Sequence, residues 1–121
     1  MKRFAIFFLA CSLLGCWPRA VEEAAHATNT IDEQVAAAYT THADVCREAS
    51  SDWAEYDACM APWNKASAQV GRLREVTLAL DLAKGRKAQR AAACEWFKVV
   101  QTLPDVPAVV VAKRSKWRRK C

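Results

Sequence analysis

Residues that break helices are scarce in this chain, and that scarcity restricts its possible folds more than any other feature. The 121 residues include only three glycines and four prolines, while 53% are hydrophobic. Glycine and proline are the residues that most strongly end helices and form turns. Because so few are present, the sequence favours a small number of long helices, and we predict an all-α fold.

Local signals divide the chain into three predicted helices. Residues 30–33 (Thr-Ile-Asp-Glu) match a capping box, so the first helix is expected to begin there. Pro62 lacks an N–H and disfavours helix at the residue before it, so the first helix is expected to end near residue 60 and the second to begin at Pro62. Gly85 is expected to cap the second helix. A third helix is predicted over residues 87–102, ahead of Pro104.

Apolar spacing predicts how these helices pack. The first predicted helix carries one apolar face, with steps of three and four residues. Its members are Ile31, Val35, Ala38, His42, Val45, Ala49, Trp53, Tyr56, Met60 and Trp63. Residues 76–82 are apolar on more than one side, as expected of a helix with two neighbours. We therefore predict a small three-helix up-down-up bundle. The alternative, a two-helix hairpin that turns at Gly71, leaves the extra apolar side exposed.

The first 16 residues have the pattern of an export signal. Lys2 and Arg3 precede an apolar stretch of about 11 residues, whereas a membrane-spanning helix needs roughly 20. The stretch ends in Leu13-Leu14-Gly15-Cys16, which resembles the lipobox of bacterial lipoproteins. The resemblance covers only these residues and implies that Cys16 carries diacylglycerol and becomes the first mature residue. It also implies the outer membrane, because Trp17 replaces the Asp that retains such proteins at the inner membrane. A plain secretory signal is the alternative.

Removal of residues 1–15 leaves 106 residues, which suits one small domain. We expect residues 16–29 to be a tether and residues 30–103 to form the helical domain. Residues 104–121 are expected to be an extended segment containing proline and ending in a basic tail, since residues 106–112 are rich in β-branched side chains.

A chain this short buries only a small hydrophobic core, so we expect disulfide bonds to stabilise it. Cys11 leaves with the signal peptide and Cys16 carries lipid, so four remain. They are Cys46, Cys59, Cys94 and Cys121. An even number in an exported chain predicts disulfides. Turns near residues 62 and 85 bring residue 94 level with residue 46, so we predict the pairs Cys46–Cys94 and Cys59–Cys121. A Cys46–Cys59 bond is not expected, because a straight helix separates these residues by roughly 20 Å.

Charge is distributed unevenly along the sequence. Residues 22–57 hold nine acidic residues and one basic residue, whereas residues 65–98 hold eight basic and three acidic residues. The last nine residues hold six basic residues, one tryptophan and no acidic residue, a composition suited to anionic lipid surfaces. The candidate binding residues are Lys113, Arg114, Lys116, Trp117, Arg118, Arg119 and Lys120. A tail that only aids solubility is the alternative.

The sequence contains no pattern typical of an enzyme. It has no glycine-rich phosphate loop and no Gly-x-Ser-x-Gly motif, so we do not expect catalysis. His42 and Cys46 lie one helical turn apart, but two ligands do not complete a zinc site, and we expect no metal or cofactor. Trp63 and Trp96 are expected in the core, with a partner-binding patch as the alternative.

These features predict an exported lipoprotein that binds or bridges components of the bacterial envelope. The lipid would anchor it, and the basic tail would contact anionic lipid, lipopolysaccharide or an acidic protein; nucleic acid is not expected. The first alternative is the outer-membrane subunit of a phage two-component spanin, which is similar only in size class, lipobox and lack of a second membrane span. The second is an envelope exclusion or inhibitor lipoprotein.

Overall fold

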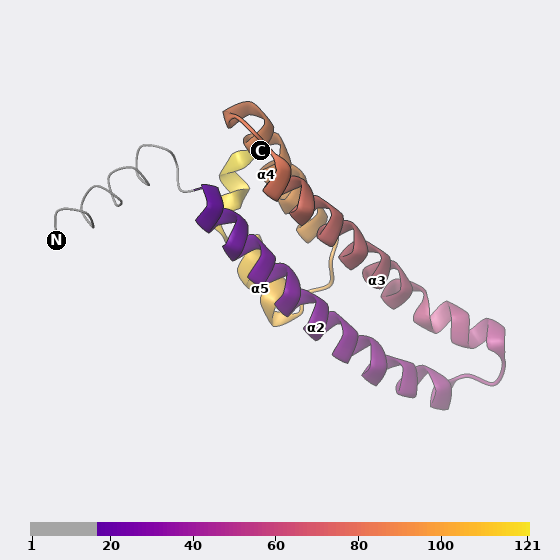
Figure 1. Cartoon of the computed structure of the whole chain (residues 1–121). Coiled ribbons are helices and arrows are strands. Elements are labelled where there is room, and N and C mark those ends of the chain that lie inside the picture. Colours follow the sequence, from indigo (N-terminus) through magenta and orange to yellow (C-terminus); the bar gives the residue numbers. More distant parts are fainter. Residues whose placement is uncertain (1–16) are drawn as a thin grey trace.

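The chain folds into helices throughout the region that the computed structural model describes, residues 17–121 (Figure 1). Four α-helices, α2 (Trp17–Ala49), α3 (Trp53–Leu82), α4 (Arg86–Gln101) and α5 (Pro107–Lys113), precede a 3-10 helix, η1 (Lys116–Lys120). The all-α prediction is confirmed. The lipobox, including Cys16, lies outside the described residues.

Helices α2 and α3 form a long antiparallel hairpin, which is the largest part of the structure (Figure 1). Contacts along its length fix its register. Near one end the hydroxyls of Thr28 and Thr77 lie 2.9 Å apart, and nearer the turn the Tyr39 hydroxyl donates a 2.8 Å hydrogen bond to Asn64. Between them, the guanidinium of Arg74 pairs with the carboxylate of Asp32.

The hairpin turns at Ser50, Ser51 and Asp52, so the predicted turn near Pro62 is wrong. The Asp52 carboxylate caps α3 by accepting a 2.8 Å hydrogen bond from the Glu55 N–H, and the Glu55 carboxylate accepts one of 2.8 Å from the Ser51 N–H. Pro62 instead lies within α3 at an exposed position. The loss of one backbone hydrogen bond is tolerated there, because a continuous α3 keeps its buried residues on the side facing α2.

Helix α2 begins at Trp17, so the predicted tether at residues 16–29 is wrong over its described part, as is the helix start at residues 30–33. The reason is burial. Ala24 and Thr28 are each 1% exposed, and the Trp17 indole donates a 3.0 Å hydrogen bond to the carbonyl of Leu80. The Thr30 hydroxyl donates to the His26 carbonyl one turn earlier and does not cap a helix.

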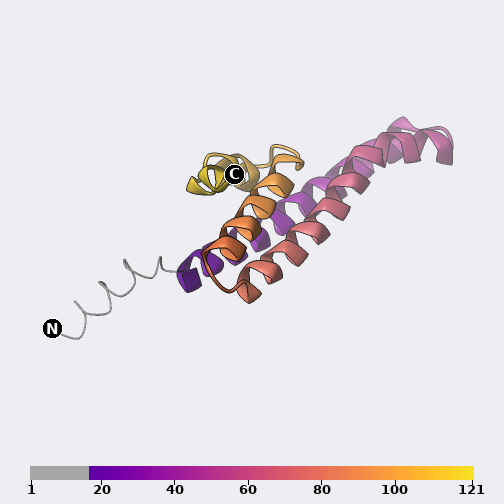
Figure 2. The same ribbon diagram turned by 90° about the horizontal axis from the view of Figure 1, so that it is seen from above.

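Helix α4 agrees with the predicted third helix to within one residue at each end. Gly85, with φ of 86°, reverses the chain between α3 and α4 in a backbone conformation that favours glycine (Figure 2). Helix α4 ends ahead of Pro104. It packs against the half of the hairpin farther from the Ser50–Asp52 turn, so the three helices do not form an even bundle, and the up-down-up arrangement is not confirmed (Figure 1).

The segment after α4 is helical, so the prediction of an extended stretch at residues 106–112 is wrong. Pro107 occupies the first turn of α5, where its missing N–H breaks no helical bond. Val109 and Ala112 are buried, and the Ala108 N–H donates a 2.7 Å hydrogen bond to the side chain of Gln34 on α2. Tertiary burial therefore overrides the β-propensity of these valines.

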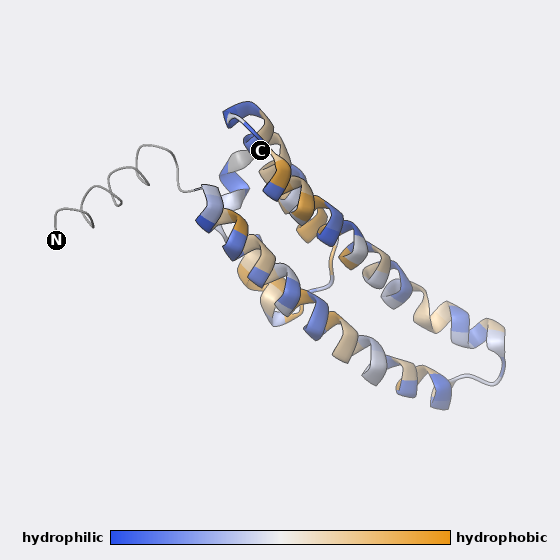
Figure 3. Ribbon diagram, in the orientation of Figure 1, coloured by the Kyte–Doolittle hydropathy of each residue, from blue (hydrophilic) through white to orange (hydrophobic). Residues whose placement is uncertain are grey.

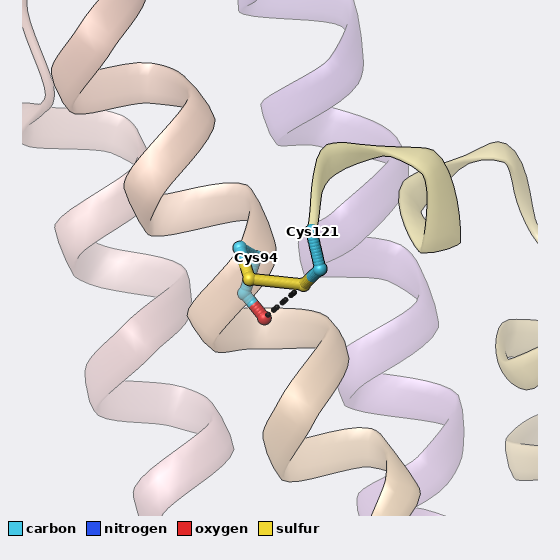
Figure 4. The surroundings of a disulfide bond; sticks show 2 residues. All are labelled: Cys94 and Cys121. Atoms are coloured by element: carbon cyan, nitrogen blue, oxygen red, sulfur yellow. Dashed lines mark hydrogen bonds between the residues drawn. A yellow bond between two sulfur atoms is a disulfide. The ribbon is translucent and has the colours of Figure 1, made fainter.

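The predicted disulfide pairs are also wrong. The structure contains Cys46–Cys59, with Cα atoms 5.7 Å apart, and Cys94–Cys121, with Cα atoms 4.9 Å apart (Figure 4). The turn at residues 50–52 lets Cys46 face Cys59 across the hairpin. The folded tail returns Cys121 to the side of α4, where Cys94 lies. The broader prediction, that these four cysteines form disulfides, is confirmed.

Buried side chains form two clusters of unequal size. The main cluster joins α2, α3, α4, α5 and the tail around Ile31, Leu73, Leu80 and Val100, which are each 0% exposed. The smaller cluster lies between α2 and α3 alone, near the turn, and consists of Ala43, Cys46 and Met60 with partly buried neighbours. The hairpin near the turn is thus a two-helix structure held by a disulfide. Figure 3 shows that hydrophilic and hydrophobic residues are interspersed along α2 and α3.

Candidate functional site

The C-terminal tail folds against the start of α2, which places both at one end of the molecule (Figure 1). The Trp117 ring lies between two tryptophans, 6.2 Å from the ring centroid of Trp17 and 5.4 Å from that of Trp96. Trp117 is only 5% exposed and Trp96 only 1%. Trp117, a candidate binding residue, is therefore packed inside this fold and is not open to a lipid surface, and Trp96 belongs to the core.

The cations of the tail have different surroundings. The Lys113 ammonium lies 2.7 Å from the carboxylate of Asp105, and the Lys116 ammonium lies 3.9 Å from that of Glu23. Three arginines of the predicted site are exposed to solvent: Arg114, Arg118 and Arg119. The backbone of Lys120 completes η1. The fold thus brings the predicted binding residues together at one end of the molecule, where Arg114, Arg118 and Arg119 are open to an external anion and Lys116 is exposed beside Glu23.

Further basic side chains lie at the same end, although the sequence analysis did not include them in the site. Lys84, Arg86 and Lys87 flank the reversal between α3 and α4, and all three are exposed. This reversal, the start of α2 and the tail lie at the end opposite the Ser50–Asp52 turn (Figures 1 and 2). We call this region the basic end. Only the tertiary structure brings these segments of the sequence to one end.

The opposite end, which we call the acidic tip, is the hairpin turn with its flanking residues 44–57. Trp53 is 79% exposed, and its ring packs edge-on against Tyr56 with centroids 5.8 Å apart. A hollow of about 640 Å³ beside them is lined by Arg47, Ser50, Ser51, Asp52, Trp53 and Tyr56. The acidic residues of the tip are Asp44, Glu48, Asp52, Glu55 and Asp57, and all are exposed.

The apolar spacing predicts that Trp53 lies on a buried helix face, and that prediction is wrong. The face was drawn as continuous through residues 50–52, where the chain in fact turns. Asp52 followed three residues later by Glu55 is the signal that could have located the turn, because this spacing is typical of a helix start. A helix of 33 residues such as α2 is about 50 Å long, so the acidic tip is far from the basic end.

A second group of side chains lies close to the acidic tip. His42 and Cys46 come from α2 and Cys59 from α3, and their ligand-type atoms all lie within 4.8 Å of one another. The His42 ring is partly buried, with its centroid 5.4 Å from that of Trp63. Sequence spacing predicts the closeness of His42 and Cys46 but not of Cys59, because a continuous helix would hold the two cysteines far apart.

No family model matches the chain, and neither the curated proteins nor the solved structures include a match to it. Among the helices of residues 17–121, none combines the length and the hydropathy that crossing a membrane requires. The two ends of the molecule, with the side chains that each exposes, are therefore its most informative features for function.

Proposed function

We propose that this protein is an exported lipoprotein, anchored through Cys16 in the bacterial outer membrane, that connects the membrane surface to a second envelope component. The basic end faces the anchoring membrane, and the acidic tip meets the partner. In this arrangement the protein acts by binding and bridging.

The contact between Trp17 and Trp117 is the observation that carries this proposal. Trp17 directly follows the candidate lipidated residue, so an anchor at Cys16 would hold the basic end close to the headgroups. A basic residue near an anionic membrane contributes about 1 kcal/mol of binding free energy. The anchor and the exposed arginines would then act on the same surface.

The acidic tip is the part of the protein suited to reach a partner. It lies at the far end of the hairpin from the start of α2 (Figure 1). It exposes both an aromatic ring and several carboxylates. Tryptophan and tyrosine are enriched among the residues that dominate binding energy at protein interfaces. Charge complementarity favours a partner with a basic surface.

Binding to vesicles tests the orientation. A soluble form of residues 17–121 should bind vesicles that contain anionic phospholipid, and binding should weaken as salt rises, because screening acts over about 10 Å at 0.1 M. The double variant Arg118→Ser, Arg119→Ser should lose about 2 kcal/mol, or roughly 30-fold in affinity.

The matched control removes two exposed cations from the half of the hairpin nearer the Ser50–Asp52 turn, Arg47→Ser with Lys65→Ser. This control should bind as tightly as the unmodified chain. If the control pair loses as much affinity as the tail pair, or if salt has no effect on binding, the basic end does not face the membrane.

A further inference from the structure

His42, Cys46 and Cys59 form a set of potential metal ligands that the fold assembles from two helices. One imidazole nitrogen and two sulfur atoms lie within 4.8 Å of one another. In the structure the two sulfurs are joined as a disulfide, which leaves neither of them as a thiolate ligand. The chemistry of this group therefore depends on the redox state of the cysteines.

The backbone already holds these residues at a separation that suits a shared metal ion. Zinc bonds to sulfur at about 2.3 Å and to imidazole nitrogen at about 2.0 Å, so the ligand atoms of a tetrahedral site lie roughly 3.5–3.8 Å apart. The Cα atoms of Cys46 and Cys59 are 5.7 Å apart. Side-chain rotation alone can open the sulfurs to the required separation once the bond between them is broken.

The surroundings combine a dry interior with a route for entry. Cys46 is 0% exposed and Met60 is 1% exposed, and both belong to the small cluster between α2 and α3. His42 and Cys59 are only partly buried, so an ion can approach from the solvent side. Thiolate and imidazole are ligands preferred by zinc and by monovalent copper.

We propose that reduction of the Cys46–Cys59 disulfide creates a binding site for a thiophilic cation, Zn²⁺ or Cu⁺, with His42 as the third ligand. A dithiol reductant supplies two electrons and two protons, the sulfur–sulfur bond breaks, and the reductant becomes a disulfide. Metal binding then releases the two thiol protons. Reoxidation by a disulfide oxidant removes two electrons, re-forms the bond and expels the ion.

The test compares oxidised and reduced forms of residues 17–121, the folded unit that the structure describes. Zn²⁺ and Cu⁺ are titrated separately in competition with a chromophoric chelator. The reduced protein should bind one equivalent of at least one of these ions through His42, and the oxidised protein should bind none.

Two histidine variants form a matched pair, because the chain has only two histidines. His42→Ala should weaken binding at least about 100-fold, since even the loss of a group that only supports a ligand costs about 10- to 100-fold. His26→Ala, at a residue on the same helix but far from the site, should leave the affinity unchanged.

Thiol alkylation followed by peptide mass spectrometry identifies the ligands even if reduction loosens the fold. The bound ion should protect Cys46 and Cys59 from alkylation and leave Cys94 and Cys121 reactive. Binding by the oxidised protein, no binding by the reduced protein, equal affinity in His42→Ala, or equal protection of all four cysteines would each refute the site. None of these measurements depends on membrane binding, so the site and the proposed function fail independently.

Discussion

At the scale of single residues, one hydroxyl links three helices. The Trp96 indole on α4 donates a 3.2 Å hydrogen bond to the Thr28 hydroxyl on α2, which in turn lies 2.9 Å from the Thr77 hydroxyl on α3. Thr77 also donates a 2.7 Å bond to the carbonyl of Leu73. Because Thr28 and Trp96 are each 1% exposed, water cannot replace these contacts.

Replacing Thr28 with valine, which has nearly the same shape, should therefore destabilise the protein. Thr28→Val leaves the buried Trp96 N–H without its acceptor, and we expect a loss of about 1–3 kcal/mol in the free energy of unfolding measured with urea. Thr40→Val is the control, since its exposed hydroxyl bonds only to the Ala36 carbonyl of its own helix. Its effect should stay within about 0.5 kcal/mol. Equal losses of unfolding free energy in the two variants would show that the buried hydrogen bonds of Thr28 do not stabilise the protein more than an exposed one.

At the scale of elements, a side-chain cap marks the start of α3 and stabilises the turn of the hairpin. Without the bond from the Glu55 N–H to the Asp52 carboxylate, this N–H in the first turn of α3 would lose its acceptor within the protein. The position of this turn sets the register in which α2 packs against α3, and it places Cys46 beside Cys59. The cap therefore stabilises the turn on which this pairing depends.

Removal of this cap should weaken α3 at its start. Asp52→Ala should lower the free energy of unfolding by about 1 kcal/mol, as expected for the loss of an N-cap side chain. Asp57→Ala changes an exposed carboxylate just beyond the first turn of the same helix and should have a smaller effect. Urea unfolding of the disulfide-bonded proteins measures both. A loss in Asp57→Ala as large as that in Asp52→Ala would contradict the capping role.

At the scale of the whole molecule, the protein has two chemically different ends. The basic end combines the start of α2, the α3–α4 reversal and the tail, and a core shared by four helices supports it. The acidic tip has only two helices, a small cluster and one disulfide. The residue that precedes Trp17 therefore decides which end would face a membrane, because a lipid there brings the basic end to the surface.

Lipidation of Cys16 is the prediction that fixes this orientation. The mature protein should begin at an acylated Cys16, as read from palmitate labelling and from the mass of its N-terminal peptide. The Cys16→Ser protein should be lost from the membrane fraction. The Cys11→Ser protein, which is changed only in the predicted signal peptide, should remain in that fraction. Two acyl chains are needed for stable anchoring, because one chain binds only marginally. A mature N-terminus at another residue would contradict the assignment.

Local chemistry in the sequence was enough to predict the helical content and part of the architecture. The scarcity of glycine and proline predicted an all-α chain, and Gly85 and Pro104 located α4 to within one residue at each end. The even number of cysteines predicted that all four would be bonded. Helix content and helix ends depend mainly on the conformational preferences of residues close together in the sequence. The presence of disulfides follows from the number of cysteines.

Tertiary packing decided the features that the sequence left open. Several positions could have ended the first helix, and the chain turns at Ser50–Asp52 while α3 continues through Pro62. Because the chain turns there, Cys46 pairs with Cys59 and not with Cys94, and Trp53 is exposed. The same turn brings Cys59 close to His42 and Cys46. The tail likewise packs against the helices because Trp117 is buried in contact with Trp17 and Trp96. Burial of apolar surface favours these arrangements, and it depends on residues far apart in the sequence, which local patterns do not specify.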